Sequence, residues 1–206
     1  ERRSYEGAFR KLLEDRRFCP PRDGLGSMPC CEGRFVTFGA QGMFCSTDHA
    51  RFVTDRGGSI VWLGKEIRQR CAASSSSSSV TVTDQFNSVL SKLGENTQYL
   101  SGSRRPIFLV FNMKAMNGVV APGVSCPSTL GFTAEEALEM CFAAGRNANV
   151  ALISFTDFNP DMEEAQTGRL VSEMVQQFLL GATRRFLDPI GSSTTSSSNN
   201  IVRFQI

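Results

Sequence analysis

Hydrophobic and polar positions along the chain follow two patterns, short apolar runs and apolar residues at helical spacing. The apolar runs are rich in β-branched and aromatic residues and have the length of buried strands. They cover residues 34–40, 59–63, 104–111 and 149–158. The helical stretches cover residues 4–14, 47–55, 84–94, 133–147 and 165–181. Strands that alternate with helices in this order predict an α/β protein with a mainly parallel sheet.

Residues that favour helix ends stand at several of these boundaries. Ser46 or Thr47 is placed to cap the second helix. Thr133 and Glu136 have the spacing of a capping box at the start of the fourth helix. Gly181 follows the last periodic residue, so we expect the fifth helix to end there.

The strand at residues 104–111, "RRPIFLVF", is apolar from Pro106 onward. An unbroken apolar run of this length is typical of a parallel strand that is buried on both faces. We therefore expect helices above and below this part of the sheet. Such a sheet would still have an edge that another chain or the tail must cover.

Two low-complexity segments interrupt the pattern. Residues 73–79 hold six serines, and residues 190–200 are again rich in serine and asparagine. Such segments bury too little apolar surface to offset their ordering entropy. We predict one α/β domain over residues 1–189 with a surface insertion at 73–79, followed by a linker and tail over 190–206. The last six residues, "IVRFQI", are a candidate edge strand.

Composition and charge narrow the function little. The chain has 206 residues, 41% of them hydrophobic, and a formal net charge of +2. Basic residues are mixed with acidic ones, which does not indicate nucleic acid but is compatible with a place in a ribonucleoprotein. No apolar run reaches the ~18 residues of a membrane span. There is no cleavable signal pattern, and because the chain does not begin with Met we expect that residues precede it.

Seven cysteines form an odd set without CxxC spacing, which favours a reducing, intracellular compartment. The sequence does not distinguish the mitochondrial matrix from the cytoplasm. Cys30 and Cys31, beside Pro29, are expected to be the exposed pair; a redox or crosslinking role is the alternative to an inert one. Cys126 lacks a neighbouring base and is expected to be packed rather than nucleophilic.

Polar residues follow three of the predicted strands. They are Gln41, Asn112 with Lys114, and the stretch 154–159. In an open parallel sheet, ligands bind beyond the carboxyl ends of the strands. Strand alternation would point Asn112 and Lys114 to the same side, the spacing at which two carboxylates jointly hold a divalent ion.

The stretch after the third strand resembles the third signature of the ureohydrolase superfamily, which comprises arginases, agmatinases and formimidoylglutamases. That signature reads Asp-x-Asp, a short spacer, Pro-Gly, then Gly-x-Thr-x-x-Glu-Ala. The stretch "SFTDFNP" (154–160) is similar to the family's strand ending in Glu-x-Asn-Pro, and residues 167–181 are similar to its terminal helix. The matching residues are Asn112, Lys114, Gly118, Pro122, Gly123, Gly131, Thr133, Glu136 and Ala137.

The resemblance implies the C-terminal half of an arginase-like three-layer αβα sandwich with a mainly parallel sheet, an incomplete copy of the fold. It also implies a manganese site, of which Asn112 and Lys114 are degenerate ligand positions. The Gly-Gly-Asp-His and Asp-Ala-His-x-Asp segments that supply the family's other ligands do not occur in this chain. A lysine ammonium would repel a nearby dication by several kcal/mol. We therefore expect no manganese, no other cofactor and no metal-generated nucleophile.

The remaining site residues have two interpretations. Asp157 falls where the resemblance puts the acid that contacts a cationic substrate, with Ser154 and Asn159 beside it in a vestigial pocket. Asp157 is expected to pair with Lys114 across adjacent strand ends. The alternative is an anion pocket made by Lys114, Asn112 and Ser154. His49, the only histidine, lacks neighbouring ligands and is expected to be a solvated helix residue.

These observations predict a non-catalytic ureohydrolase-like protein that acts as a structural or interaction subunit of a larger assembly, with an organelle as one candidate location. Its partners would be other proteins or further copies of itself. The alternative is a manganese-dependent C–N hydrolase whose other metal ligands lie outside this chain. A third class is an adaptor that binds a small cation through Asp157.

Overall fold

The computed structural model describes residues 6–21, 28–73, 79–95, 106–163 and 165–188. Most of the serine-rich insertion and the whole predicted linker and tail lie outside these ranges, so those predictions stay untested. Among the described residues, no helix is long and apolar enough to cross a membrane.

Four strands form two parallel pairs, as the apolar runs predict. β1 (Val36–Ala40) pairs with β2 (Ser59–Trp62), and β3 (Ile107–Asn112) pairs with β4 (Val150–Thr156). The described residues place these pairs in two separate two-stranded sheets rather than in one continuous sheet. Each strand therefore has one edge without a hydrogen-bonded neighbouring strand.

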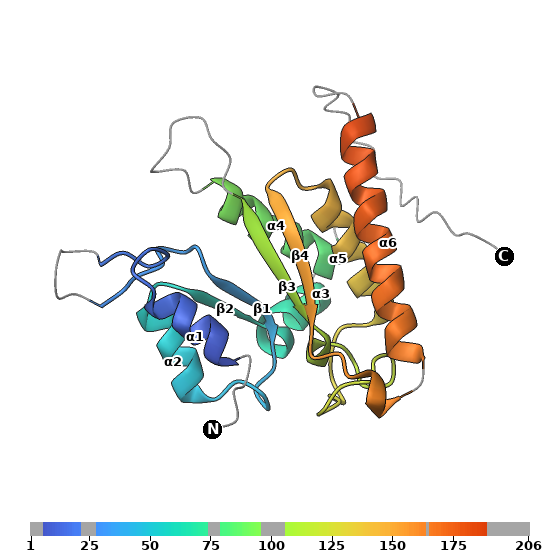
Figure 1. The fold of residues 1–206 in the computed structure, drawn as a ribbon, viewed down its shortest axis with the longest axis horizontal. Coiled ribbons are helices and arrows are strands. Elements are labelled where there is room, and N and C mark those ends of the chain that lie inside the picture. The colour runs from blue at the N-terminus through green and yellow to red at the C-terminus, as the bar shows by residue number, and fades with distance from the viewer. Residues whose placement is uncertain (1–5, 22–27, 74–78, 96–105, 164, 189–206) are drawn as a thin grey trace.

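The helices surround the strands (Figure 1). The five predicted helices are present, and a π-helix (Leu63–Arg68) that runs into α3 is an element the sequence pattern does not predict. Short 3-10 turns follow β3 and β4 at Met113–Ala115 and Pro160–Met162. The α-helices are α1 (Glu6–Glu14), α2 (Thr47–Asp55), α3 (Gln69–Ala73), α4 (Val82–Glu95), α5 (Ala134–Arg146) and α6 (Gln166–Leu187).

Three layers are present around the β1–β2 pair. On one face, Ile60 packs with Leu13 of α1 and Val53 of α2 in a small core. On the other, Phe38 packs edge-on against Phe86 of α4, with ring centroids 5.6 Å apart. Because neighbouring residues of a strand point to opposite faces, both faces of this pair are covered.

The β3–β4 pair has helices on one face only. Phe111 and Phe155 stack at 5.9 Å within the main core, to which α5 and α6 also contribute. Phe108 and Leu152 lie opposite each other in register and are 58% and 56% exposed. The prediction that the third strand is covered on both faces is therefore wrong for the described residues.

Glycine at the α5–α6 contact explains why the last helix continues past its predicted end. α6 runs to Leu187 rather than stopping at Gly181. A Cβ at Gly181 would overlap the carbonyl oxygen of Phe142, and a Cβ at Gly145 would overlap that of Phe178. The two glycines let the helix backbones approach closely, so Gly181 is a packing residue and not a helix stop.

The predicted caps hold two of the helices. Ser46 accepts a hydrogen bond from His49 N at the start of α2. Thr133 and Glu136 exchange both bonds of a capping box at the start of α5. Because α5 begins at this box, the loop that enters it has a defined end.

Candidate functional site at the strand ends

The ends of β3 and β4 bring two opposite charges together. Lys114 Nζ lies 3.5 Å from Asp157 Oδ1, and the two side chains are only 20% and 12% exposed. The predicted contact between Lys114 and Asp157 is confirmed. The ammonium stands where the family resemblance places a metal ligand.

A turn, and not strand alternation, positions Lys114. β3 ends at Asn112, whose Oδ1 accepts a hydrogen bond from Lys114 N at 2.9 Å and so caps the 3-10 turn Met113–Ala115. Asparagine favours such local bonds to the backbone. The prediction that Asn112 and Lys114 point to the same side by alternation is wrong in its reason, because the strand does not extend to Lys114.

Asp157 is held in a backbone conformation that suits few residues. Its φ of 64° is in the left-handed region, which aspartate tolerates better than most non-glycine residues. Its Oδ2 atom is buried and accepts no hydrogen bond from the described residues. The carboxylate therefore has spare acceptor capacity beside the lysine.

The other two residues of the predicted pocket, Ser154 and Asn159, occupy positions in the strand pair and in the loop after it. Ser154 lies opposite Val110 in the β3–β4 register and is half-buried. Asn159 accepts a hydrogen bond from Asp161 N at 3.0 Å, and its own N–H donates to Gly123 O at 2.8 Å. Asn159 thus ties the loop after β4 to the loop after β3.

The loop from Met116 to Gly131 is fixed by contacts at both ends. Gly123 N donates to the fully buried hydroxyl of Thr167 at 2.8 Å. Gln41, at the end of β1, donates to Ala115 O at 3.4 Å and accepts from the hydroxyl of Ser128. The three predicted strand ends therefore do converge, through this loop.

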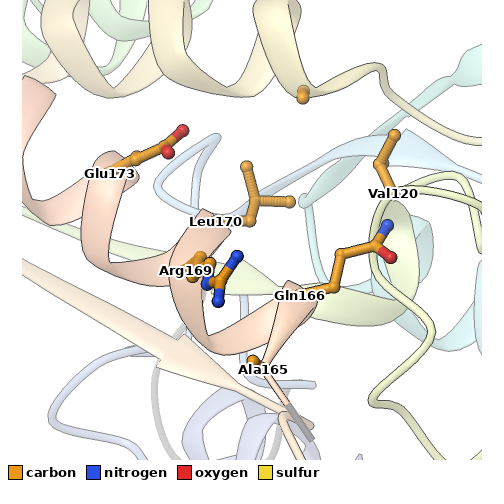
Figure 2. A pocket seen from close by; sticks show the side chains of 7 residues that line it. Val120, Ala165, Gln166, Arg169, Leu170 and Glu173 are labelled. Carbon is orange, nitrogen blue, oxygen red and sulfur yellow. The ribbon is translucent and has the colours of Figure 1, made fainter. Parts of the chain in front are cut away.

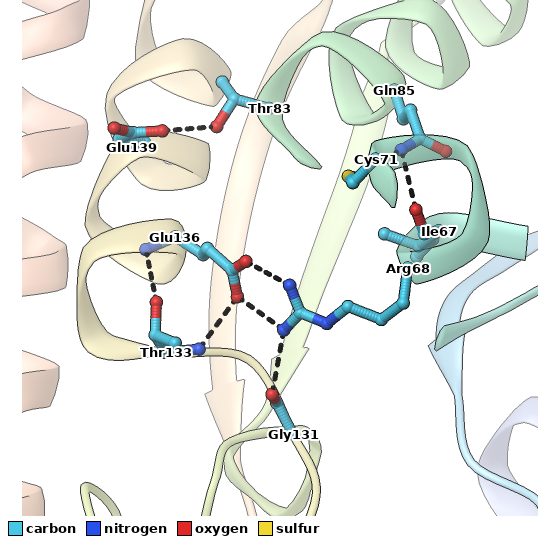
Figure 3. A network of polar contacts seen from close by, with 9 residues as sticks. All are labelled: Ile67, Arg68, Cys71, Thr83, Gln85, Gly131, Thr133, Glu136 and Glu139. Atoms are coloured by element: carbon cyan, nitrogen blue, oxygen red, sulfur yellow. Dashed lines mark hydrogen bonds and ion pairs between the residues drawn. The ribbon is translucent and has the colours of Figure 1, made fainter. Parts of the chain in front are cut away.

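A second polar network lies beside the loop, and the sequence analysis missed it (Figure 3). Arg68 makes a bidentate contact with Glu136, with Nη2 2.8 Å from Oε2, and the same Nη2 donates to Gly131 O at 3.1 Å. Burial raises the pKa of Glu136, but hydrogen bonds from Arg68 and Thr133 outweigh this effect and leave it below its ordinary value. The π-helix that places Arg68 gave no periodic signal by which to find this contact.

An open pocket of about 510 Å³ lies between the start of α5 and the first turns of α6 (Figure 2). Arg169 and Glu173 of α6 point toward it, while Leu170 forms part of its apolar wall. Lys114 and Asp157 do not line it. The pocket residues are Val120, Ala134, Ala165, Gln166, Arg169, Leu170 and Glu173.

The histidine and the cysteines considered in the sequence lie away from the strand ends, and only the prediction for His49 agrees with the structure. His49 is exposed on α2, as predicted. Cys126 is exposed, so the prediction that it is packed is wrong; its loop turns the side chain outward. Cys30 and Cys31 are 6% and 0% exposed, so the prediction of an exposed pair is also wrong, because this segment packs into the small core.

Comparison with protein-family models gives a match to the Arginase family over residues 68–181. This match spans more than half of the chain, which therefore belongs to the arginase family. The structure is an arginase-like α/β fold, and it is incomplete relative to the solved structures that it resembles. The comparison with curated proteins found no match.

Three solved structures illustrate the likeness. Trypanosoma cruzi formiminoglutamase with Mn²⁺ is 29% identical, with a TM-score of 0.68, and the match covers 88% of this chain and 52% of that one. Formimidoylglutamase from Bacillus subtilis subsp. subtilis str. 168 is 18% identical, with a TM-score of 0.61, and the match covers 73% of this chain and 42% of that one. Arginase from the same source is 17% identical, with a TM-score of 0.55, and the match covers 70% of this chain and 43% of that one. The chain thus spans about half the length of these proteins, and the two Bacillus likenesses concern the fold alone.

The strand-end residues of this chain do not fit a manganese centre. Of the two positions that resemble ligands, Asn112 uses its Oδ1 to cap the turn, and Lys114 is a cation paired with Asp157. No group of three or more His, Cys, Asp or Glu side chains is arranged to hold a metal within the described ranges. Hard divalent ions prefer several oxygen ligands of negative charge, which this edge does not supply.

Proposed function

We propose that this arginase-family chain is non-catalytic and acts as a structural or interaction subunit. The observation that carries the proposal is the ion pair between Lys114 and Asp157. The ammonium provides a fixed positive charge at the place where a family hydrolase would need a dication. Without a metal to lower the pKa of a bound water, hydrolysis of a linear amidine has no nucleophile near neutral pH.

The retained features support a role that depends on shape. Thr167 still holds the Pro-Gly turn, the capping box starts α5, and Gly145 and Gly181 still allow α5 and α6 to pack closely. These contacts stabilise the fold and involve no catalytic group. Because one fold can host different functions, these contacts only agree with the proposal, and the ion pair at the strand ends carries it.

The protein partners, or further copies of the chain, would cover apolar surface left open by the described residues. Phe108 and Leu152 are neighbours on the open face of β3–β4. We place the protein in a reducing intracellular compartment, the mitochondrial matrix or the cytoplasm, because its seven cysteines form an odd set without CxxC spacing. No cofactor is part of this proposal.

Restoring the carboxylates tests the loss of the metal site. The double variant Asn112→Asp/Lys114→Asp of the full-length protein should gain manganese uptake relative to the wild type. Lys92→Asp, an exposed change on α4, is the control for added negative charge alone. Equal uptake by the double variant and this control would contradict the view that these positions are decayed ligands.

The competing function is a manganese-dependent hydrolase whose remaining ligands lie in residues beyond this chain. The match covers only 52% of the Trypanosoma cruzi formiminoglutamase with Mn²⁺, so that protein has further residues that this chain does not match, which favours this alternative. It predicts that the wild-type full-length protein releases ammonia from a formimino or guanidino substrate and that a chelator stops the reaction. The structural proposal predicts no release above that of a blank without protein.

A further inference from the structure

Two cysteines that are distant in the sequence lie together in the small core between α1, α2 and β2. Cys19 and Cys31 are both fully buried, in contact with the cluster formed by Leu13 and Val53. All seven cysteines are free thiols in the structure. Cys19 and Cys31 are therefore two reduced thiols that lie together inside the protein.

The local backbone sets the two residues opposite each other. Pro21 and Pro29 form an antiparallel bridge. Counted outward from this bridge, the next facing pair is Pro20 with Cys30, where Cys30 N donates to Pro20 O at 3.4 Å. The same register would set Cys19 opposite Cys31, and a side-chain hydrogen bond links these two thiols.

The alternation of an antiparallel ladder makes this last pair suitable for a disulfide. Because Pro20 and Cys30 are a hydrogen-bonded pair, the pair after it is not hydrogen-bonded, and its Cα atoms lie about 4.5 Å apart in regular geometry. The amide groups agree: Cys19 N donates to Asp15 O and Cys31 N to Arg56 O. A disulfide needs Cα atoms roughly 4.4–6.8 Å apart, and a facing pair of this kind meets that requirement.

The other cysteines are poorer partners. Cys30 and Cys31 are adjacent, and Cα atoms of neighbouring residues are about 3.8 Å apart, which is shorter than a disulfide normally spans. Cys141 lies in the main core and Cys126 is exposed on a loop of the other half. Cys30 is also buried near Cys19, but the side-chain hydrogen bond of Cys19 is with Cys31, which makes Cys31 the favoured partner.

Nearby groups favour a thiolate at this place once it forms. Arg34 Nε donates to Cys31 O at 2.9 Å, and its Nη2 is buried with no acceptor among the described residues. Burial nevertheless raises the pKa of Cys31 and raises that of Cys19 to about 12. The thiols stay protonated in the closed protein, so exchange requires a brief local opening.

We propose that Cys19 and Cys31 form an oxidisable dithiol that becomes a disulfide by exchange with a low-molecular-weight disulfide. In the first step one cysteine thiolate attacks a sulfur of oxidised glutathione, and one glutathione thiolate leaves and takes up the proton. In the second step the other cysteine attacks the protein sulfur of the mixed disulfide, and the second glutathione leaves. The protein loses two protons and two electrons, and oxidised glutathione gains them to become two molecules of reduced glutathione. This site is independent of the proposed function.

The new bond would tie the segment after α1 to the segment that enters β1. It would close the loop from Cys19 to Cys31, which reduces the conformational freedom of the unfolded chain. Oxidation is therefore expected to raise the Tm of the protein, and dithiothreitol to reverse the increase.

Peptide mapping of the full-length protein tests the pairing. The reduced protein is incubated with oxidised glutathione, blocked with N-ethylmaleimide and cut with trypsin, which separates Cys19 (residues 18–22) from Cys31 (residues 23–34). We expect these two peptides as one linked species that carries a single N-ethylmaleimide on Cys30 and is otherwise two hydrogens lighter than the sum of the unmodified peptides. Exposed Cys126 reports that the oxidant is active, because it should take up glutathione first.

Variants assign the bond. Cys30→Ser should keep the linked peptides and Cys31→Ser should lose them. The opposite result would overturn the proposal. The proposal would also be wrong if Cys19 and Cys31 stay reduced after Cys126 is fully modified, even when urea below the unfolding transition is added. If Cys31→Ser does not fold, the Tm increase of Cys30→Ser on oxidation is the second measurement, and an unchanged Tm would likewise contradict the bond.

Discussion

Lys114 and Asp157 form an ion pair at the ends of two neighbouring parallel strands, with Nζ 3.5 Å from Oδ1 and both side chains mostly buried. The two residues come from different loops, so their contact joins the turn after β3 to the turn after β4. A buried pair of this kind costs desolvation energy, and removing one partner leaves an uncompensated charge. The role of this ion pair can therefore be tested by measuring protein stability, without knowing a ligand.

Replacement of the lysine alone should destabilise the protein. Lys114→Met leaves the Asp157 carboxylate buried without its cation, and we expect the free energy of unfolding to fall by about 2 kcal/mol or more. Lys114→Met/Asp157→Asn should recover most of this loss, because asparagine also tolerates a positive φ. Urea unfolding of both single variants and the double variant measures the coupling.

An exposed ion pair provides the control for that cycle. Arg10 and Glu14 form an i,i+4 pair in α1 whose side chains are 68% and 42% exposed. Their coupling should be no more than about 0.5 kcal/mol. A coupling between Lys114 and Asp157 as small as this would show that the strand-end pair is not structurally important.

The close contact of α5 and α6 predicts an unusual response to alanine. Gly181→Ala improves helix propensity by up to about 1 kcal/mol, yet its Cβ would overlap the carbonyl oxygen of Phe142. We expect net destabilisation of about 1–3 kcal/mol, because the helices must move apart. Gly7→Ala in α1, where nothing lies within 4 Å of the added Cβ, should be neutral or slightly stabilising in the same thermal unfolding assay.

The Arg68–Glu136 contact predicts a pH-dependent contribution to stability. The folded protein lowers the pKa of Glu136 from 4.5, so the contribution is present above pH 4.5 and is lost as the pH falls below that value. Glu136→Gln should cost about 1–3 kcal/mol at pH 7 and progressively less in more acidic solution. A difference between variant and wild type that stays constant from pH 7 down through the acidic range would contradict this account.

The hydroxyl of Thr167 holds the Pro-Gly turn. Thr167→Val keeps the shape but removes the acceptor for Gly123 N, and an unsatisfied buried N–H costs about 1–3 kcal/mol. Thr167→Ser keeps the acceptor and should lose clearly less stability. Hydrogen exchange of the Gly123 amide measures the effect directly, and equal exchange in the two variants would rule out this role.

The sequence predicts a helix well where a capping residue stands directly before a stretch of apolar residues at helical spacing. Ser46, Thr133 and Glu136 mark helix starts that the structure contains. Gly181 misled the prediction, since a glycine that ends a helix and one that permits close helix packing look alike in a single sequence. The π-helix carrying Arg68 has no apolar period to reveal it.

The candidate site was predicted in part. Lys114 and Asp157 were expected to meet because parallel strands end at one edge of a sheet, and they do. The burial of Cys31 was missed because it depends on contacts with Leu13 and Val53, which lie far from it in the sequence. The exposure of Phe108 depends on what lies beside β3 in space, which the apolar run itself does not specify.

Manganese content of the purified full-length protein, measured by elemental analysis after incubation with excess Mn²⁺ and removal of free ion, tests the central claim most directly. The ion pair between Lys114 and Asp157 predicts no bound manganese at this site and a content equal to that of a sample never incubated with Mn²⁺. About two ions per chain in the wild type, as in a two-metal hydrolase, would contradict the account and support the competing hydrolase function.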